Sequence, residues 1–232
     1  MKQLKWLLLV MLLPTFGFGQ SGLTVGYNLG MCNPAEVNRF IYSYNQMRPF
    51  LTKPMDPFSN WGGLSVAFIE EFSEGGGLEL KWINHHSQVS AEAPDSVNNT
   101  SFERDLKIRS NTINLGGYGA ITSNISIGGS LDFGNFKGYT RVADKEIVKD
   151  TAYTKVFQTE SHFLNLQIAS TIFVQYHTGP IGLRLFYQYQ WMRMPLDGLD
   201  NTLINQNIDD LVTPGDKFSN MGVELFFKLG GY

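Results

Sequence analysis

The chain has 232 residues and a net charge of −3, so it lacks the general basic surface on which nucleic-acid-binding proteins rely. Its single cysteine excludes an intramolecular disulfide and a zinc site built from several cysteines. Glycine (24 residues), phenylalanine (17) and tyrosine (10) are frequent, and only 17% of the residues are charged. This composition favours strands and turns over helical bundles, and barrels of this length commonly form a single domain.

The start of the chain has the pattern of a secretory signal peptide. Lysines precede the apolar run 6–13, and small residues follow at the positions required for cleavage after Gly19. The apolar run is too short to span a bilayer. We therefore expect residues 1–19 to be a cleaved signal peptide and residues 20–232 to form the exported mature domain.

The mature chain consists largely of segments in which apolar and polar residues alternate with a period of two, the pattern of β-strands. We place eight strands, at 22–30, 61–72, 76–86, 106–121, 124–141, 161–176, 181–194 and 218–230. Short turns alternate with long loops, and the long loops are expected at 31–60, 87–105, 142–160 and 195–217. An even number of strands with the long connections gathered at one end is typical of bacterial outer-membrane barrels.

The two faces of each predicted strand differ in polarity. In the segment 181–192, for example, Leu183 and Leu185 share one face, whereas Arg184 and Gln188 share the other. A soluble barrel turns its apolar face inward and a membrane barrel turns it outward. Export, small residues on the polar face and aromatic residues at the ends of the apolar strips favour the second arrangement. The predicted fold class is all-β, an eight-stranded antiparallel up-and-down transmembrane barrel.

In these features the chain resembles the small outer-membrane barrels of the OmpA/OmpX type. The resemblance covers essentially the whole mature chain, but it is architectural and carries over no catalytic residue. It implies location in the outer membrane of a Gram-negative cell envelope, in contact with outer-membrane lipid and lipopolysaccharide. It also implies that assembly machinery recognises the last strand, although Gly230 and Gly231 separate that strand from the terminal Tyr232.

The inner face of the predicted barrel carries charges of both signs. An eight-stranded barrel is just wide enough for side chains to fill its interior, so we do not expect a diffusive pore. Buried charges are tolerated when they are paired. We therefore expect an ion-paired network in the periplasmic half of the lumen, formed by Glu71, Glu79, Lys81, Arg184, Glu224 and Lys228. This network is interpreted as a static polar core, with a gate as the alternative.

The first long loop, 31–60, contains a predicted helix. Asn33 is a suitable N-cap and Pro34 suits the first helical position. Apolar residues then follow at positions i, i+3, i+4 and i+7, namely Val37, Phe40, Ile41 and Tyr44. This spacing predicts a short amphipathic helix whose apolar side is buried within the protein.

Further apolar residues follow the predicted helix, at Phe50, Leu51, Met55 and Phe58. Exposed apolar clusters of this kind mark binding surfaces for other proteins. These four residues are therefore the candidate partner-binding site in the first extracellular loop, and internal packing against the other loops is the alternative. The leading functional hypothesis is a scaffold or accessory subunit that binds another, unidentified cell-envelope protein through its extracellular loops.

The chain offers little evidence for an enzyme. His85 and Ser87 share a strand face, as a general base and a nucleophile could, but the sequence places no carboxylate beside them and they are expected to face the lumen. The acidic residues of 195–217 could in principle bind calcium, but their spacing matches no EF-hand pattern and favours a solvated acidic loop. We therefore predict a non-enzymatic protein without metal or cofactor, and keep a lipid-modifying hydrolase and a small gated channel as alternatives.

Overall fold

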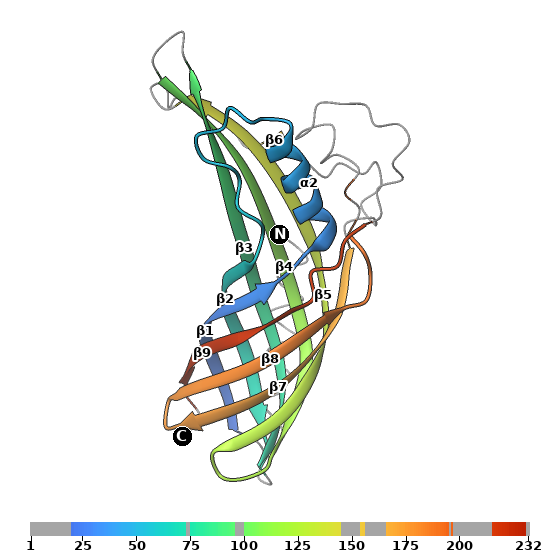
Figure 1. Ribbon diagram of the computed structural model, residues 1–232. Coiled ribbons are helices and arrows are strands. Elements are labelled where there is room, and N and C mark those ends of the chain that lie inside the picture. Colours follow the sequence, from blue (N-terminus) through green and yellow to red (C-terminus); the bar gives the residue numbers. More distant parts are fainter. Residues whose placement is uncertain are drawn as a thin grey trace, which may run out of the picture.

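The computed structural model describes residues 20–72, 75–95, 100–144, 154–155, 166–194, 196 and 215–230. The predicted signal peptide lies outside these residues. The elements in chain order are β1 (Gln20–Cys32), α2 (Ala35–Gln46), β2 (Asn60–Glu71), β3 (Gly76–Asp95), β4 (Thr100–Ala120), β5 (Ile125–Asp144), β6 (Thr154–Lys155), β7 (Leu166–Thr178), β8 (Ile181–Gln190) and β9 (Asn220–Leu229) (Figure 1).

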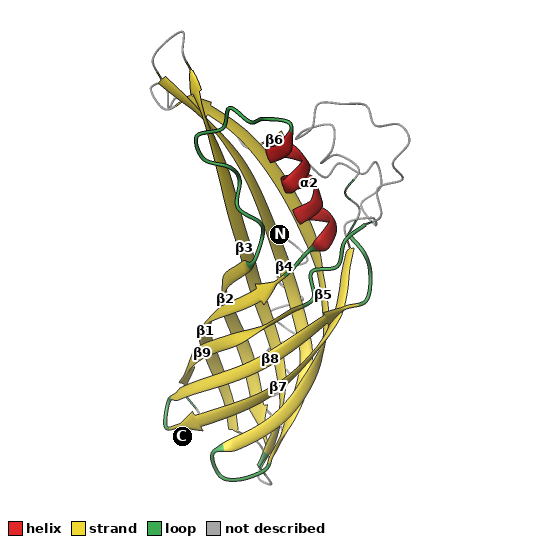
Figure 2. Cartoon of the chain, in the orientation of Figure 1, coloured by secondary structure: helices red, strands yellow, loops and turns green. Residues whose placement is uncertain are grey.

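The strands form one closed barrel. Each long strand pairs antiparallel with the next long strand in the chain, and β1 pairs with β9 to close the sheet. The short β6 only extends the edge of β5. The predicted eight-stranded up-and-down barrel with a helix after the first strand is therefore confirmed. We call the end that carries α2 the loop end and the opposite end, with the tight connections, the turn end (Figure 2).

The outer wall of the barrel is apolar. Side chains that alternate along each strand are exposed on this wall, among them Leu23, Val25, Leu29, Leu115, Leu131, Ile172, Leu183, Leu185, Val223 and Leu225. A continuous apolar band of this extent is unfavourable in water, but it matches the hydrocarbon of a bilayer. The polar side chains of the same strands point into the lumen, so the barrel has the transmembrane arrangement. No helix in the described part of the chain is long and apolar enough to cross a membrane.

Strands β3, β4 and β5 extend further toward the loop end than the sequence predicted. The β3–β4 ladder continues from Gly76 opposite Gly119 up to Asp95 opposite Thr100, and β5 continues to Asp144. Much of the predicted loop 87–105, and the start of the loop predicted at 142–160, is therefore strand, and these two loop boundaries were wrong. Figure 1 shows this three-stranded extension rising well beyond the rest of the barrel. Its outer face is polar because it has left the membrane-facing band, which obscures the strand pattern.

A hydrophobic core lies at the loop end, where α2 packs on the extension. Val37, Phe40, Ile41 and Tyr44 of α2 are buried, as predicted from their spacing. They belong to one cluster with residues from the inner face of β3 and β4, namely Ala91, Leu106 and Ile108. We call the unit formed by α2, residues 47–58 and the extension the platform.

Candidate functional site

Four of the six charged residues predicted in the lumen form one buried cluster, which we call the ion cluster. The Nη1 and Nη2 atoms of Arg184 donate to Oε1 and Oε2 of Glu79, at 2.9 and 2.6 Å. Lys81 Nζ lies 3.1 Å from Glu79 Oε1 and 2.9 Å from Glu224 Oε2, and Arg184 Nη1 lies 3.5 Å from the same Glu224 oxygen. Two cations thus balance two anions, and all four side chains are at most 6% exposed. This arrangement satisfies the requirement that buried charges be paired.

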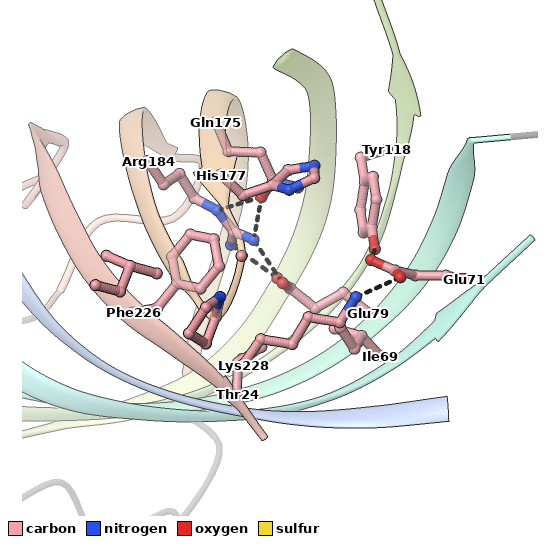
Figure 3. Close-up of a pocket in the computed structure, with 13 residues that line it drawn as sticks. Thr24, Ile69, Glu71, Glu79, Tyr118, Gln175, His177, Arg184, Phe226 and Lys228 are labelled. Carbon is pink, nitrogen blue, oxygen red and sulfur yellow. Dashed lines mark hydrogen bonds and ion pairs between the residues drawn. The ribbon is translucent and has the colours of Figure 1, made fainter. Parts of the chain in front are cut away.

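The other two predicted residues form a separate pair closer to the turn end. Lys228 Nζ donates to Glu71 Oε2, and the hydroxyl of Tyr118 donates to Glu71 Oε1 at 3.0 Å. Figure 3 shows this pair beside the ion cluster, with Arg184 reaching toward the same cavity. The cavity between them measures about 20 Å³, which is room for a water molecule.

A third polar group, centred on Asp132, lies further along the lumen. Its carboxylate accepts hydrogen bonds from Asn114 Nδ2 (2.6 Å), Ser130 Oγ (2.7 Å), Thr171 Oγ1 (2.5 Å) and Gln188 Nε2 (2.8 Å). Neutral donors from β4, β5, β7 and β8 therefore satisfy this buried charge in place of a cation. The sequence places Asp132 on the inner face, but the alternation of residues does not reveal which donors converge on it.

Aromatic side chains close the lumen toward the loop end. The ring centroid of Trp61 lies 5.7 Å from that of Phe218 and 6.0 Å from that of Phe136, and the two phenylalanine rings are 5.1 Å apart. A second cavity in the lumen, lined in part by His85, Asn114 and Glu224, measures about 20 Å³. Among the described residues, side chains therefore fill the lumen at the ion cluster and the aromatic layer, and each of the two cavities there measures only about 20 Å³.

The pair considered for a hydrolase is poorly placed for catalysis. His85 is 2% exposed, and its ring lies 5.5 Å from that of Trp61. Its Nε2 has no hydrogen-bond partner among the described residues. A general base needs access to the substrate and an orienting partner, so this geometry does not suit nucleophilic catalysis by His85 and Ser87.

The N-terminus of α2 is capped by a residue from the far end of the chain. The sequence predicted Asn33 as the N-cap, but the N-cap position is Pro34 and carries no side-chain cap, so this prediction was wrong. Instead, Asp216 Oδ2 accepts hydrogen bonds from the backbone N–H groups of Glu36 (2.8 Å) and Val37 (3.0 Å). A carboxylate at this position satisfies otherwise unpaired N–H groups and interacts favourably with the helix dipole. The segment before β9 thereby fixes the helix above the barrel.

The residues after α2 are held down by two asparagines of the helix. Asn45 exchanges two 2.9 Å hydrogen bonds with the backbone of Met55, and Asn38 donates to the carbonyl of Phe58 at 3.1 Å and accepts from its N–H at 2.7 Å. These bonds turn the two apolar side chains into the core, where Met55 is 2% and Phe58 1% exposed. The expectation that both contact a partner is therefore corrected. The seven-residue spacing of the asparagines, which places them on one helix face, is the signal that the sequence offered.

The other two residues of the predicted binding site have different environments. Leu51 packs partly buried against the core cluster. Phe50 is 59% exposed. Tyr42, in the second half of α2, and Met47, directly after the helix, were not predicted as part of this site and are 63% and 40% exposed. The exposed apolar surface of this region is therefore Tyr42, Met47 and Phe50.

We expect Asp216→Ala to destabilise the platform by about 0.5–2 kcal/mol, the usual effect of losing an N-cap. Asp216→Asn retains an acceptor oxygen and is the matched control. Burial raises the pKa of Asp216 above its ordinary 3.8, although the N–H groups of Val37, Lys217 and Glu36 oppose this shift. The folded protein therefore holds this proton more tightly than the unfolded chain does.

This pKa difference gives the sign of a pH effect. The contribution of Asp216 to stability is greatest below its ordinary pKa and declines as pH rises through the raised pKa of the folded state. Urea unfolding of the platform, followed by tryptophan fluorescence in lipid vesicles, should show this decline in the wild type and lack it in Asp216→Asn. Equal pH profiles in the two proteins would contradict this assignment.

The similarity of this chain to known proteins lies among solved structures. No protein-family model matches the chain, and no curated protein matches it. The crystal structure of Ail, the attachment invasion locus protein of Yersinia pestis, in complex with the heparin analogue sucrose octasulfate is similar over 92% of this chain and 99% of that chain, with 15% identity and a TM-score of 0.40. A second crystal structure of Ail has 14% identity over the same shares and a TM-score of 0.41. The outer membrane protein OprG from Pseudomonas aeruginosa has 12% identity, covers 92% of this chain and 95% of its own, and has a TM-score of 0.35.

The fold shows which way the apolar face of the barrel points: it points outward, as in a membrane barrel. The closed sheet, the apolar outer wall and the filled lumen are the architecture of the small eight-stranded outer-membrane barrels, and the predicted resemblance to that class is confirmed.

Proposed function

We propose that this chain is an outer-membrane barrel that holds the platform outside the cell as a docking surface for another cell-envelope protein. The signal peptide predicted for residues 1–19 and the apolar outer wall support an exported membrane protein. The short connections at one end and the platform at the other support an orientation with the loop end outside. The filled lumen supports a role other than conduction.

The observation that carries the docking role is the order of the platform. An ordered segment loses conformational entropy that a disordered loop retains. Here the cap from Asp216 and the hydrogen bonds from Asn38 and Asn45 hold the segment in place, and yet Tyr42, Met47 and Phe50 remain exposed. A rigid surface that presents aromatic side chains resembles the binding surfaces at which few residues contribute most of the affinity.

The test is site-specific photo-crosslinking in intact cells. A crosslinking amino acid at position 50 should give a discrete adduct with one envelope protein, whereas the same group at Phe102, which is 40% exposed at the tip of β4, should not. Tyr42→Ala with Phe50→Ala should weaken co-purification of that protein by about tenfold or more, because both truncations remove apolar contact area.

Two measurements establish that each variant is folded and located correctly. Variants should fractionate with the outer membrane and migrate faster on gels before heating than after it. A folded, correctly located protein that gives no adduct at position 50 would contradict the docking role, and recovery from the soluble periplasm would contradict the location.

A further inference from the structure

A row of basic side chains crosses the outer face of the extension. His86 of β3 lies directly opposite Arg109 of β4, and Arg109 lies directly opposite Lys137 of β5. All three side chains are exposed. We call this set the basic row. Since neighbouring strands are about 4.8 Å apart, the row spans about 10 Å across the three strands.

The basic row has a defined height relative to the membrane-facing band. On the same outer face of β3, β4 and β5, one row toward the turn end consists of Asn84, Asn111 and Asn135, and the next consists of Trp82, Ile113 and Phe133. Trp82, Ile113 and Phe133 are exposed. Aromatic residues in such positions mark the interface of the bilayer. The asparagine row thus begins where the hydrocarbon ends, and the basic row lies one row further out, at the level of the lipid headgroups.

The fold gives no reason for this concentration of charge. Like charges directly opposite each other in a sheet are destabilising, and Arg109 and Lys137 form such a pair. The row below contains only asparagines, and the row above contains Gln88, Lys107 and Tyr139. The carboxylate of Asp105, one row higher still, is paired with Arg141 at 2.5 Å. Among the described residues, no ion pair involves Arg109 or Lys137.

We propose that the basic row binds the phosphate groups of an anionic lipid of the outer leaflet, of the lipid A type. An arginine guanidinium matches phosphate oxygens in a bidentate geometry, and lysine adds a compact positive charge. The amide groups of the asparagine row lie between the cations and the band, with Asn84 Nδ2 donating to Asn111 Oδ1 at 2.5 Å. They can hydrogen-bond the polar part of the headgroup below its phosphate. A lipid seated there has its acyl chains against Trp82 and Phe133.

This inference rests on the proposed outer-membrane location and is independent of the docking role. The test uses the purified full-length protein in a non-ionic detergent, titrated with diphosphoryl lipid A and followed by native mass spectrometry. Arg109→Gln with Lys137→Gln should weaken lipid A binding by about thirtyfold, given the usual contribution of basic residues at an anionic membrane surface. Lys53→Gln with Arg193→Gln removes the same charge from exposed residues outside the row and should retain binding.

Stability supplies a second measurement. Without lipid A, the Arg109→Gln, Lys137→Gln variant should melt no lower than the wild type, because the substitution removes a like-charge pair. With lipid A, the wild type should gain more thermal stability than the variant does. If the double variant fails to show the gel shift of a folded barrel, Lys137→Gln alone replaces it, with an expected loss of about fivefold.

Three results would overturn the proposal. Unchanged lipid A binding in the row variant would remove the site, and an equal loss in the control variant would show a general effect of charge. Displacement of lipid A by inorganic phosphate at comparable concentration would show that the row binds a free anion and not a membrane lipid. Failure of the protein to fractionate with the outer membrane would refute the location instead, and is distinguished from these results by the cell fractionation.

Discussion

Arg184→Leu is expected to cause the largest loss of stability in the barrel. The substitution removes the cation that contacts both Glu79 and Glu224, and leaves two buried carboxylates with Lys81 alone. Removing one member of a buried, hydrogen-bonded ion pair costs about 3–5 kcal/mol, because the remaining charge is uncompensated. Urea unfolding in lipid vesicles, followed by the gel shift of the folded barrel, should show a free energy of unfolding that is lower by that amount.

The double variant Glu79→Leu, Arg184→Leu is the control for this prediction. It removes one cation and one anion together, so Lys81 and Glu224 remain as a neutral pair at 2.9 Å. We expect the double variant to recover most of the lost stability, because an apolar pair of similar size can replace a buried ion pair with little penalty. If both variants lose the same free energy of unfolding, the loss reflects packing and not unpaired charge.

Phe58→Ala is expected to open the platform without unfolding the barrel. Phe58 is 1% exposed within the core cluster, and truncation of a buried phenylalanine costs about 3–5 kcal/mol through lost burial and the cavity that remains. Amide hydrogen exchange of α2 in reconstituted protein should therefore increase strongly. The heat-dependent gel shift of the barrel should persist.

Phe50→Ala is the matched control, because Phe50 is 59% exposed a few residues earlier in the same segment. Its truncation should leave the exchange rates of α2 close to those of the wild type. Similar protection of α2 in Phe58→Ala and the wild type would contradict the packing of Phe58 in the core cluster, whereas strong exchange in Phe50→Ala would assign that residue to the core as well.

The sequence predicted those features that depend on local periodicity. Alternation of residues gave the strands and the polarity of the two faces, and the i, i+3, i+4, i+7 spacing gave α2 and its buried side. The same alternation placed Glu79 and Arg184 inside the lumen. It could not pair them across the lumen, because they lie on β3 and β8, separated by 105 residues.

The errors arose where tertiary contacts override local patterns. The apolar residues after α2 were predicted to form an exposed binding surface. Hydrogen bonds with Asn38 and Asn45 instead turn Met55 and Phe58 into the core. The loop predicted at 87–105 is mostly strand, because Ala91 and Leu106 pack against a helix that the strand pattern does not include. The basic row follows from strand register across β3, β4 and β5, which the sequence leaves undetermined once the apolar alternation stops.

The cap on α2 has a consequence for the order of assembly. Asp216 is separated from the N–H groups that it accepts by 179 and 180 residues, and it lies just before β9, the strand that pairs with β1 to close the sheet. Bringing such distant segments together is slow because a long intervening chain must first be ordered. The acceptor for the helix N-terminus and the strand that closes the barrel therefore belong to one segment of the chain. We expect a chain whose first and last strands have not yet paired to leave the N–H groups of Glu36 and Val37 without this acceptor, so that α2 is fully capped only in the closed barrel.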